Sequence, residues 1–507
     1  MNLPLVVFQW LVVAWDAVQI ELKGTYSPDR VLALHDYSNL TPWWRIVSVI
    51  LISPLPCLIY VCLPETVNLS PPSLGMGSNK TFFGRFFLSY TMWCLLQMHM
   101  ISERMPLLSL SKTQLVISAV TVAILSTGIE LLYSWWIGFP VPYTIHMMAV
   151  PYVSLMFFAL AIVWYPHVRQ NLGLLWKIAD AILICVCHGL MDSGIERTAF
   201  IMVLPVLKTF YRALFYYLCR FASGQRITIA VVFNADMVNA LFMNFCMQYQ
   251  PSFMTTASLM AANTVQVILM THDIDVIRKQ IAQTTKRIIN LTKNDRGDRV
   301  ATLSMLPRAV DIFQRYTFHN SSDDAHHTQL TSTMKITVVP LGNSASQLGP
   351  TTDIVVGTRS ELEQLEQKYV SLVRKLMYAS EFSILTAYAE VITPIVYCTA
   401  VFGHMPNRDY YSQIASMDSI HLAKTVVNVL LYSLVELGAF TVLTQTLKRR
   451  LNFSTMHQLA FVLDRHVIHV QTASILWVFY TTQISLEHYG TDYSFKFAWL
   501  ENNSTGT

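Results

Sequence analysis

Long apolar runs separated by short polar connections dominate the chain from residue 44 to 270 and again from 382 to 486. A helix that crosses about 30 Å of hydrocarbon needs roughly 20 mostly apolar residues. Eleven runs come close to this length, at 44–63, 82–101, 115–138, 143–165, 178–193, 199–219, 227–247, 253–270, 382–402, 425–447 and 466–486. In lipid the backbone N–H and C=O groups have no water to bond, so they must bond each other, as they do in a helix. The pattern therefore predicts an all-α polytopic transmembrane bundle of about eleven spans, of which 178–193 is the weakest.

The first 43 residues are expected to form an N-terminal interfacial segment. Leu3–Ile20 is apolar, but polar residues recur in it at helical spacing, beside Trp10 and Trp15. This pattern is typical of an amphipathic helix on the membrane surface, and we favour it over a twelfth span.

Residues 271–381 interrupt the series of spans as one long insertion between spans eight and nine. Its first part, Asp275–Lys293, alternates isoleucines with basic residues, which predicts a basic amphipathic helix along the anionic inner leaflet. The residues expected to contact that leaflet are Arg278, Lys279, Lys286 and Arg287.

The rest of the insertion divides into two further parts. Residues 294–350 are rich in Ser, Thr, Asn, Asp and His, so we expect them to be mostly disordered, apart from a short strand at 335–339. Arg359–Met377 carries Leu or Tyr in steps of three and four, which favours a helical stalk packed on its own protein over a coiled coil. Residues 382–507 then hold spans nine to eleven and a C-terminal tail.

Basic residues predict the orientation of the bundle. One side of the spans carries twelve in its short connections: Lys23, Arg30, Arg104, Lys112, Arg169, Lys177, Arg220, Arg226, Lys448, Arg449, Arg450 and Arg465. The other side carries five: Lys80, Arg197, Arg408, Lys424 and Lys496. The richer side is expected to be cytosolic. This assignment places the N-terminus and the insertion in the cytosol and the C-terminus outside or in a lumen, in the plasma membrane or an endomembrane.

Composition excludes several classes of protein. Only 13% of the residues are charged and 53% are hydrophobic, which neither a disordered chain nor an ordinary soluble domain would show. The net charge of +4 lies mostly on one side of the spans. It therefore indicates the orientation of the bundle in the membrane and is not evidence for a nucleic-acid partner. All eight cysteines fall in apolar runs, and no phosphate-binding loop, zinc-hydrolase motif or serine-hydrolase motif is found. We therefore predict no cofactor, no metal site and no catalytic residue, and lean against an enzyme.

Several short strings carry a resemblance that spans residues 20 to 500. They are Tyr26–Arg30, Leu55–Cys57, Gly138–Pro142, Leu204–Val206 with Lys208 and Arg212, Asn234–Asp236 with Cys246–Gln248, and HYGTDYSFKFAWL from His488. In these strings the chain resembles a large family of uncharacterised multi-pass membrane proteins from oomycetes, the Phytophthora-like water moulds. The resemblance implies the same architecture and no particular activity.

Ionisable residues inside the predicted spans are the strongest candidates for function, because each costs roughly 2.5–3.5 kcal/mol at a helix centre unless it finds a partner. The candidates are Glu130, Lys208, Arg212, Asp236, Glu390 and Glu436. We expect Asp236 and at least one of Glu390 and Glu436 to satisfy Lys208 and Arg212, leaving Glu130 outside this network. Pro394 frees the carbonyl of Glu390 from its helical bond and is expected to kink that helix.

Three interpretations of these charges stay open: interhelical pairing without function, ion or proton coupling, and a ligand-sensing cavity. Buried charges beside a proline-interrupted helix favour a transporter for a small solute or ion that has no nucleotide motor. The alternative is a receptor or scaffold that presents residues 271–381 to a cytosolic partner. The sequence gives no indication of oligomeric state.

Overall fold

The computed structural model describes residues 20–104, 110–170, 208–217, 227–249, 253–291, 305–321, 351–403, 405–412, 414–415 and 417–491. These residues form helices and connections. No β-strand occurs among them, and only an isolated bridge joins Tyr411 to Leu486. The predicted surface helix at 3–20 falls outside the described residues except for Ile20. So do span 178–193, the first half of span 199–219 and the strand at 335–339.

Five helical stretches in the described chain are long and apolar enough to cross a membrane. They are Trp43–Thr66, Lys112–Trp136, Thr144–Val163, Glu361–Val401 and Leu422–Leu451. In four of them only 22–39% of the apolar window is buried inside the protein, whereas in Glu361–Val401 the buried share is 83%. The four therefore present apolar side chains outward, as lipid-facing helices do, and the fifth is central.

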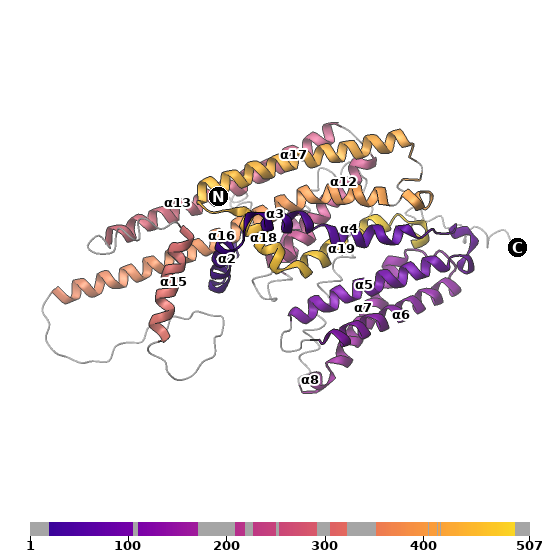
Figure 1. Ribbon diagram of the computed structural model, residues 1–507, viewed down its shortest axis with the longest axis horizontal. Helices are drawn as coiled ribbons and strands as arrows, with labels where there is room; N and C mark the ends of the chain where they lie inside the picture. Colours follow the sequence, from indigo (N-terminus) through magenta and orange to yellow (C-terminus); the bar gives the residue numbers. More distant parts are fainter. Residues whose placement is uncertain are drawn as a thin grey trace, which may run out of the picture.

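The central helix is α16 (Thr351–Gly403), which packs against α13 (Phe253–Leu291), α17 (Ser419–Leu451) and α12 (Met237–Tyr249). Beside it lies α19 (Val467–Gln483), most of whose side chains are buried against α4, α5, α12 and α16. Figure 1 shows α16 and α19 running through the middle of the bundle. At 17 residues, α19 is slightly short for a span and is enclosed by its neighbours.

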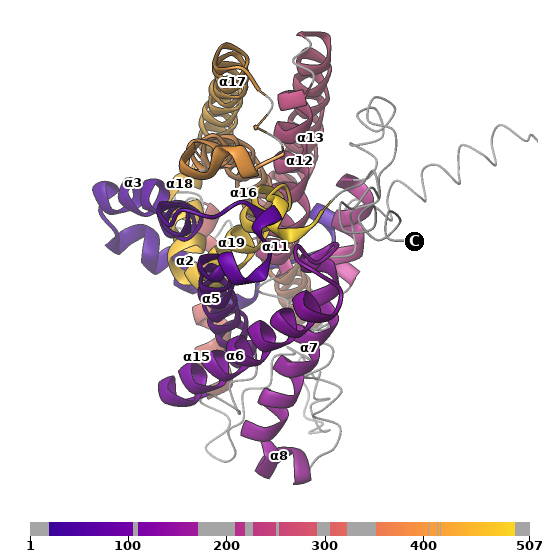
Figure 2. The same cartoon turned by 90° about the vertical axis from the view of Figure 1, so that its right-hand side faces the viewer.

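A second group of helices, α5 (Lys80–Arg104), α6 (Lys112–Trp136) and α7 (Thr144–Val163), packs as neighbours on one side of α19. Figure 2 shows these three helices together, apart from α17 and α13. Ser111 caps the start of α6 with a capping box. Its hydroxyl oxygen accepts from the Gln114 N–H, and the Gln114 side-chain oxygen accepts from the Ser111 N–H. Trp135 and Trp136 are exposed at the other end, where aromatic rings favour a membrane interface.

The first predicted span is broken into α3 (Trp43–Ile52), α4 (Leu55–Cys62) and the short η2 (Leu63–Thr66). Pro54 and Pro56 explain the break, because neither has a backbone N–H. Side chains bond the carbonyls there: Gln471 donates to Ser53 over 2.5 Å and Tyr388 to Ile50 over 2.9 Å. The Ile50 and Ser53 carbonyls are thus satisfied by side chains of the protein.

The stretch 271–381 differs from the expected insertion. Two long helices enter it from the bundle without a break, since α13 continues to Leu291 and α16 starts at Thr351. At 1.5 Å per residue they are about 58 and 80 Å long, well beyond the thickness of the hydrocarbon. Figure 1 shows both projecting beyond the rest of the bundle, and they pack on each other. No structural boundary lies at residue 381.

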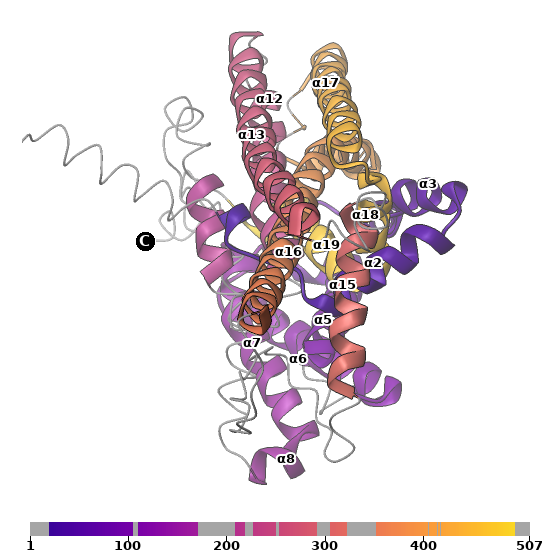
Figure 3. The ribbon, with the colours of Figure 1, turned by 90° about the vertical axis from the view of Figure 1, so that its left-hand side faces the viewer.

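Within the stretch predicted to be mostly disordered, residues 305–321 form helix α15 (Met305–Ser321). Its apolar face is buried, as Val310 and Phe313 show, and it packs against α16 and against α2 (Pro28–Leu40), an arrangement visible in Figure 3. Tyr369 on α16 donates to the carbonyl of Met305 over 3.1 Å. The polar composition of 294–350 hid this amphipathic segment from a composition argument.

Candidate functional site: a buried charge cluster

Four elements bring the predicted charged residues together inside the bundle. Lys208 and Arg212 lie one turn apart on the helical segment 208–217, and Asp236 ends the π-helix η6 (Val232–Asp236). Glu390 lies on α16 and Glu436 on α17. π-Helical turns are rare, and they occur frequently at functional sites because they turn a side chain out of the regular helical register.

Two ion pairs form the centre of this cluster. Lys208 Nζ lies 2.7 Å from Glu390 Oε1, and Arg212 Nε lies 2.6 Å from Asp236 Oδ1. Lys208 Nζ is also 3.9 Å from Asp236 Oδ1, so the two pairs touch. The hydroxyl of Thr386 on α16 donates to Asp236 Oδ2 over 2.9 Å. All four charged side chains are at most 7% exposed.

Glu436 extends the cluster from α17 without forming an ion pair among the described residues. Its Oε1 accepts a hydrogen bond of 3.1 Å from Asn263 of α13, and Asn263 also donates to Tyr432 over 2.9 Å. Glu436 interacts electrostatically with Glu390 and Lys208. Asn263 was missing from the predicted site because a search for ionisable residues does not find an amide.

Pro394 lies inside α16, four residues after Glu390, and α16 continues through it as one helix. Proline has no N–H, so the carbonyl of Glu390 loses its usual helical partner. The backbone is therefore weakened next to the carboxylate that pairs with Lys208.

The structure contains a second buried polar cluster, which we name the inner cluster: Tyr26, Arg30, Glu381 and Gln458. Arg30 Nη2 lies 2.7 Å from Glu381 Oε2, Tyr26 donates to the same oxygen, and Gln458 donates to Tyr26 over 2.9 Å. Burial and the Glu381 carboxylate raise the pKa of Tyr26 well above its usual value. Burial disfavours the charge on Arg30, but Glu381 outweighs this effect and raises the pKa of Arg30. Arg30 therefore keeps its charge.

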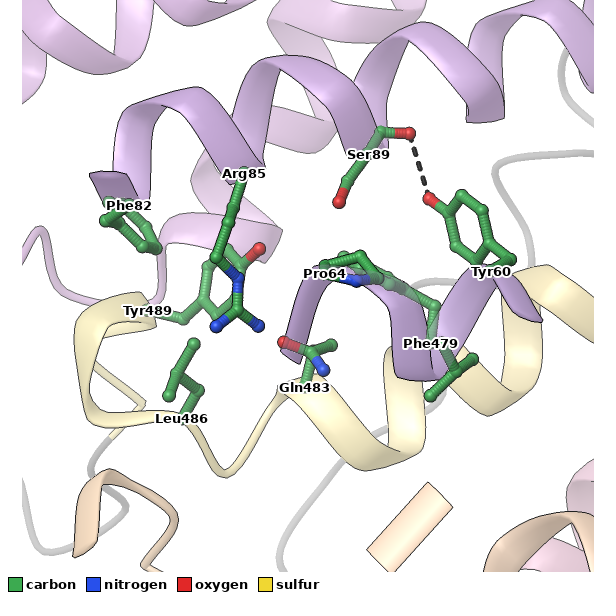
Figure 4. A pocket seen from close by; sticks show the side chains of 10 residues that line it. Tyr60, Pro64, Phe82, Arg85, Ser89, Phe479, Gln483, Leu486 and Tyr489 are labelled. Carbon is green, nitrogen blue, oxygen red and sulfur yellow. Dashed lines mark hydrogen bonds between the residues drawn. The ribbon is translucent and has the colours of Figure 1, made fainter. Parts of the chain in front are cut away.

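The third cluster, the outer cluster, consists of Glu65, Arg85, Asn407, Tyr411 and Gln483. Glu65 Oε1 lies 2.5 Å from Arg85 Nη2, and it accepts from Tyr411 over 2.6 Å and from Gln483 over 3.0 Å. Asn407 donates to the Glu65 carbonyl over 3.1 Å. Figure 4 shows Arg85 extending from α5 into a small pocket beside this cluster.

The sequence prediction missed both of these clusters. Arg85 falls inside the predicted span 82–101, but only three residues from its start, where a long side chain is expected to reach water. Glu381 lies one residue before a predicted span, and Glu65 lies two residues after one. Their partners come from distant parts of the chain, so local spacing gave no signal.

The four basic residues predicted to contact lipid lie on α13. Lys279, Lys286 and Arg287 are exposed, and Arg278 bonds Asp275 over 3.1 Å. In the same stretch Ile277, Ile281 and Ile288 are buried in protein, whereas Ile289 is half-buried and Val276 is exposed, so most of the apolar stripe packs on the protein itself. Contact of the four charges with the inner leaflet stays a prediction. No group of three or more His, Cys, Asp or Glu residues suited to a metal occurs in the described ranges.

Four outward-facing apolar helices and a fifth, buried one that carries part of the charged interior indicate an α-helical membrane protein. Comparison of the chain with protein-family models, with curated proteins and with solved structures finds no match. Function must therefore be argued from the charge cluster itself.

Proposed function

We propose that this protein is a secondary transporter, a carrier for a small solute or ion that uses no nucleotide motor. The observation that supports the proposal is the buried cluster of Lys208, Arg212, Asp236, Glu390 and Glu436. Charged groups at this depth are costly and are typical of ion or proton pathways.

The charge balance of the cluster favours coupling to a cation over simple pairing. Two basic groups face three carboxylates, and the two short ion pairs use Asp236 and Glu390. Glu436 is left with an amide and a phenol as neighbours, next to the carboxylate of Glu390. Two carboxylates at close range cannot both ionise cheaply, so the cluster binds one further proton or cation. Gain and loss of that cation would change the attraction between α16 and α17.

The inner and outer clusters fit such a carrier as the closing contacts at its two ends. Glu381 and Glu390 are nine residues apart on α16, about 14 Å along the axis. Asn407 of the outer cluster follows the other end of α16. Buried ion pairs on both sides of a central charge site can open in turn only if the helices that carry them move relative to one another.

Uptake into proteoliposomes tests the proposal. Purified protein is reconstituted, exposed to pools of labelled amino acids, sugars, organic acids, nucleosides and inorganic ions, and compared with empty vesicles. Uptake of at least one class above empty vesicles is the expected result. Absence of uptake in every pool, with protein that is monodisperse and correctly inserted, would remove the transporter proposal.

A membrane scaffold or receptor is the second candidate, and the projecting helices α13, α15 and α16 favour it. Glu361 and Lys368 are exposed on α16 and would be available to a partner. Reversing these two charges should abolish partner capture if the protein is a scaffold and should leave solute uptake unchanged if it is a carrier.

The cytosolic N-terminus, the eleven-span count and membership of the oomycete family belong with this proposal as predictions. Glycosylation mapping of tags at the two termini tests the first two, because eleven spans require the ends to lie on opposite sides.

A further inference from the structure

The three-helix group α5, α6 and α7 contains a buried carboxylate that the charge cluster does not use. Glu130 lies on α6, six residues before its end at Trp136, and is fully buried. Its Oε1 lies 3.4 Å from the hydroxyl of Thr144, the first residue of α7. Its Oε2 has no hydrogen-bond partner among the described residues.

Other oxygen atoms with unused bonding capacity lie on the same face of α6. Ser126 and Ser134 are one turn before and one turn after Glu130. Both side chains are at most 5% exposed, and within the described chain neither hydroxyl has a partner. Residues four apart on a helix have neighbouring side chains. Three acceptor oxygens that lack partners therefore occupy one buried stripe.

The Thr144 hydroxyl lies within hydrogen-bond distance of two acceptors, the carbonyl of Val141 at 2.9 Å and Glu130 Oε1 at 3.4 Å. A hydroxyl has one proton, so it donates to only one of them at a time. Donation to the nearer Val141 carbonyl leaves a lone pair of Thr144 Oγ1 facing the Glu130 carboxylate. Two acceptors that face each other need a positive centre between them.

We propose that Glu130, Thr144 and Ser134, the serine nearer the end of α6, form a binding site for a sodium ion. Hard cations bind carboxylate, hydroxyl and carbonyl oxygens at about 2.3–2.6 Å. Two adjacent ligands of an octahedral cation with bonds of about 2.4 Å are about 3.4 Å apart, which matches the distance between Glu130 Oε1 and Thr144 Oγ1.

The single negative charge of Glu130 favours a monovalent ion over a divalent one. Glu130 is the one carboxylate in this group, and no basic side chain contributes to its electrostatic surroundings among the described residues. A sodium ion neutralises a single carboxylate, whereas a divalent ion would leave a buried positive charge. A proton would also neutralise Glu130 but would give only one of the unpartnered oxygens a hydrogen bond.

The site is separate from the charge cluster, so the inference does not depend on transport. Thr144 directly follows the turn 137–143, whose residues are partly exposed except for Val141. A sodium ion there would join α6 to α7 and stabilise the three-helix group.

Thermal unfolding of the purified full-length protein at pH 7.5 tests the site, with sodium chloride titrated against N-methyl-D-glucamine chloride at constant ionic strength. Sodium should raise the melting temperature of the wild-type protein by a few degrees, in a saturable manner. Glu130→Gln should abolish the shift, and Glu436→Gln should keep it. If Glu130→Gln does not fold, Thr144→Val and Ser134→Ala should each raise the half-saturating sodium concentration several-fold.

Three results would overturn the site: no sodium-dependent shift in the wild-type protein, an equal shift in Glu130→Gln, or unchanged half-saturation in both hydroxyl variants. A melting temperature that depends on pH through Glu130 but not on sodium would identify a proton as the occupant and would also refute the proposal. The assay requires no transport. Sodium binding without any solute uptake would therefore leave this site in place while removing the carrier function.

Discussion

Removal of Asp236 should destabilise the protein more than removal of Asp236 together with Arg212. In Asp236→Leu the buried Arg212 loses its ion-pair partner at 2.6 Å and, among the described residues, keeps the Thr386 hydroxyl at 3.4 Å and the more distant charges of Glu21 and Glu390. A buried charge without a counter-ion costs roughly 3–5 kcal/mol. The single substitution is therefore expected to lower the free energy of unfolding by about that amount.

The double variant Asp236→Leu with Arg212→Met removes a neutral pair. Lys208 keeps Glu390 at 2.7 Å and loses only its longer 3.9 Å contact with Asp236. Apolar replacement of a complete buried pair is often neutral or stabilising. We expect the double variant to lie within about 1–2 kcal/mol of the wild-type protein, so it should be less destabilised than Asp236→Leu alone and the two single losses should be far from additive.

The assay is reversible unfolding of the four proteins of this cycle in mixed micelles, followed by tryptophan fluorescence. The exposed pair Arg45 and Asp464, 3.1 Å apart, serves as a matched control and should give a coupling of about 0.2–1 kcal/mol. Additive losses at Asp236 and Arg212, with coupling no larger than in this control, would refute the pairing argument.

Three further predictions concern the outer end of the bundle. Burial lowers the pKa of His488 to about 4, so protonation of this side chain favours the unfolded chain. Above pH 6.5 His488 should therefore not reduce the free energy of unfolding. As the pH falls from 6.5 to 4, about 3 kcal/mol of that free energy should be lost. Melting curves from pH 4 to 8 should show this loss in the wild-type protein and a smaller one in His488→Gln; equal losses would contradict it. Gly490→Ala should lower stability by at least about 1–3 kcal/mol, because φ is +60° and a Cβ atom would lie 2.1 Å from the Val141 carbonyl oxygen. Gly438→Ala in α17, where nothing lies within 4 Å of the added atom, should be neutral or stabilising in the same unfolding assay, and an equal loss at both sites would contradict the steric argument. Arg85→Met should cost roughly 3–5 kcal/mol, because it leaves the buried Glu65 carboxylate without its cation, and a loss below about 1 kcal/mol in that assay would contradict a buried ion pair.

Hydropathy and spacing were sufficient to predict an all-helical membrane protein and to single out the charged residues at its centre. The reason is physical: apolar runs of this length have few stable arrangements outside lipid, and charges within them must meet a counter-charge. Lys208 and Arg212 are one turn apart, and Asp236 follows on the next predicted span. The sequence therefore already pointed to Asp236 as their partner.

The remaining contacts depend on which helices are neighbours, and one sequence does not carry that information. Arg30 meets Glu381 across more than 300 residues, and Asn263 meets Glu436 across 173. The isoleucine stripe of α13 is equally suited to lipid and to another helix, so its periodicity could not distinguish a surface helix from one packed on α16. Likewise, α15 was not predicted because the segment 294–350 that contains it has a low apolar content.

The most direct measurement of the central claim is the proton or cation current that a transported solute produces in proteoliposomes on a solid-supported membrane. The wild-type protein should give solute-dependent currents, Glu436→Gln should lose them, and Glu361→Gln on the exposed part of α16 should retain them. Currents of wild-type size in Glu436→Gln, from equal amounts of inserted protein, would contradict the assignment of the buried cluster as the coupling site.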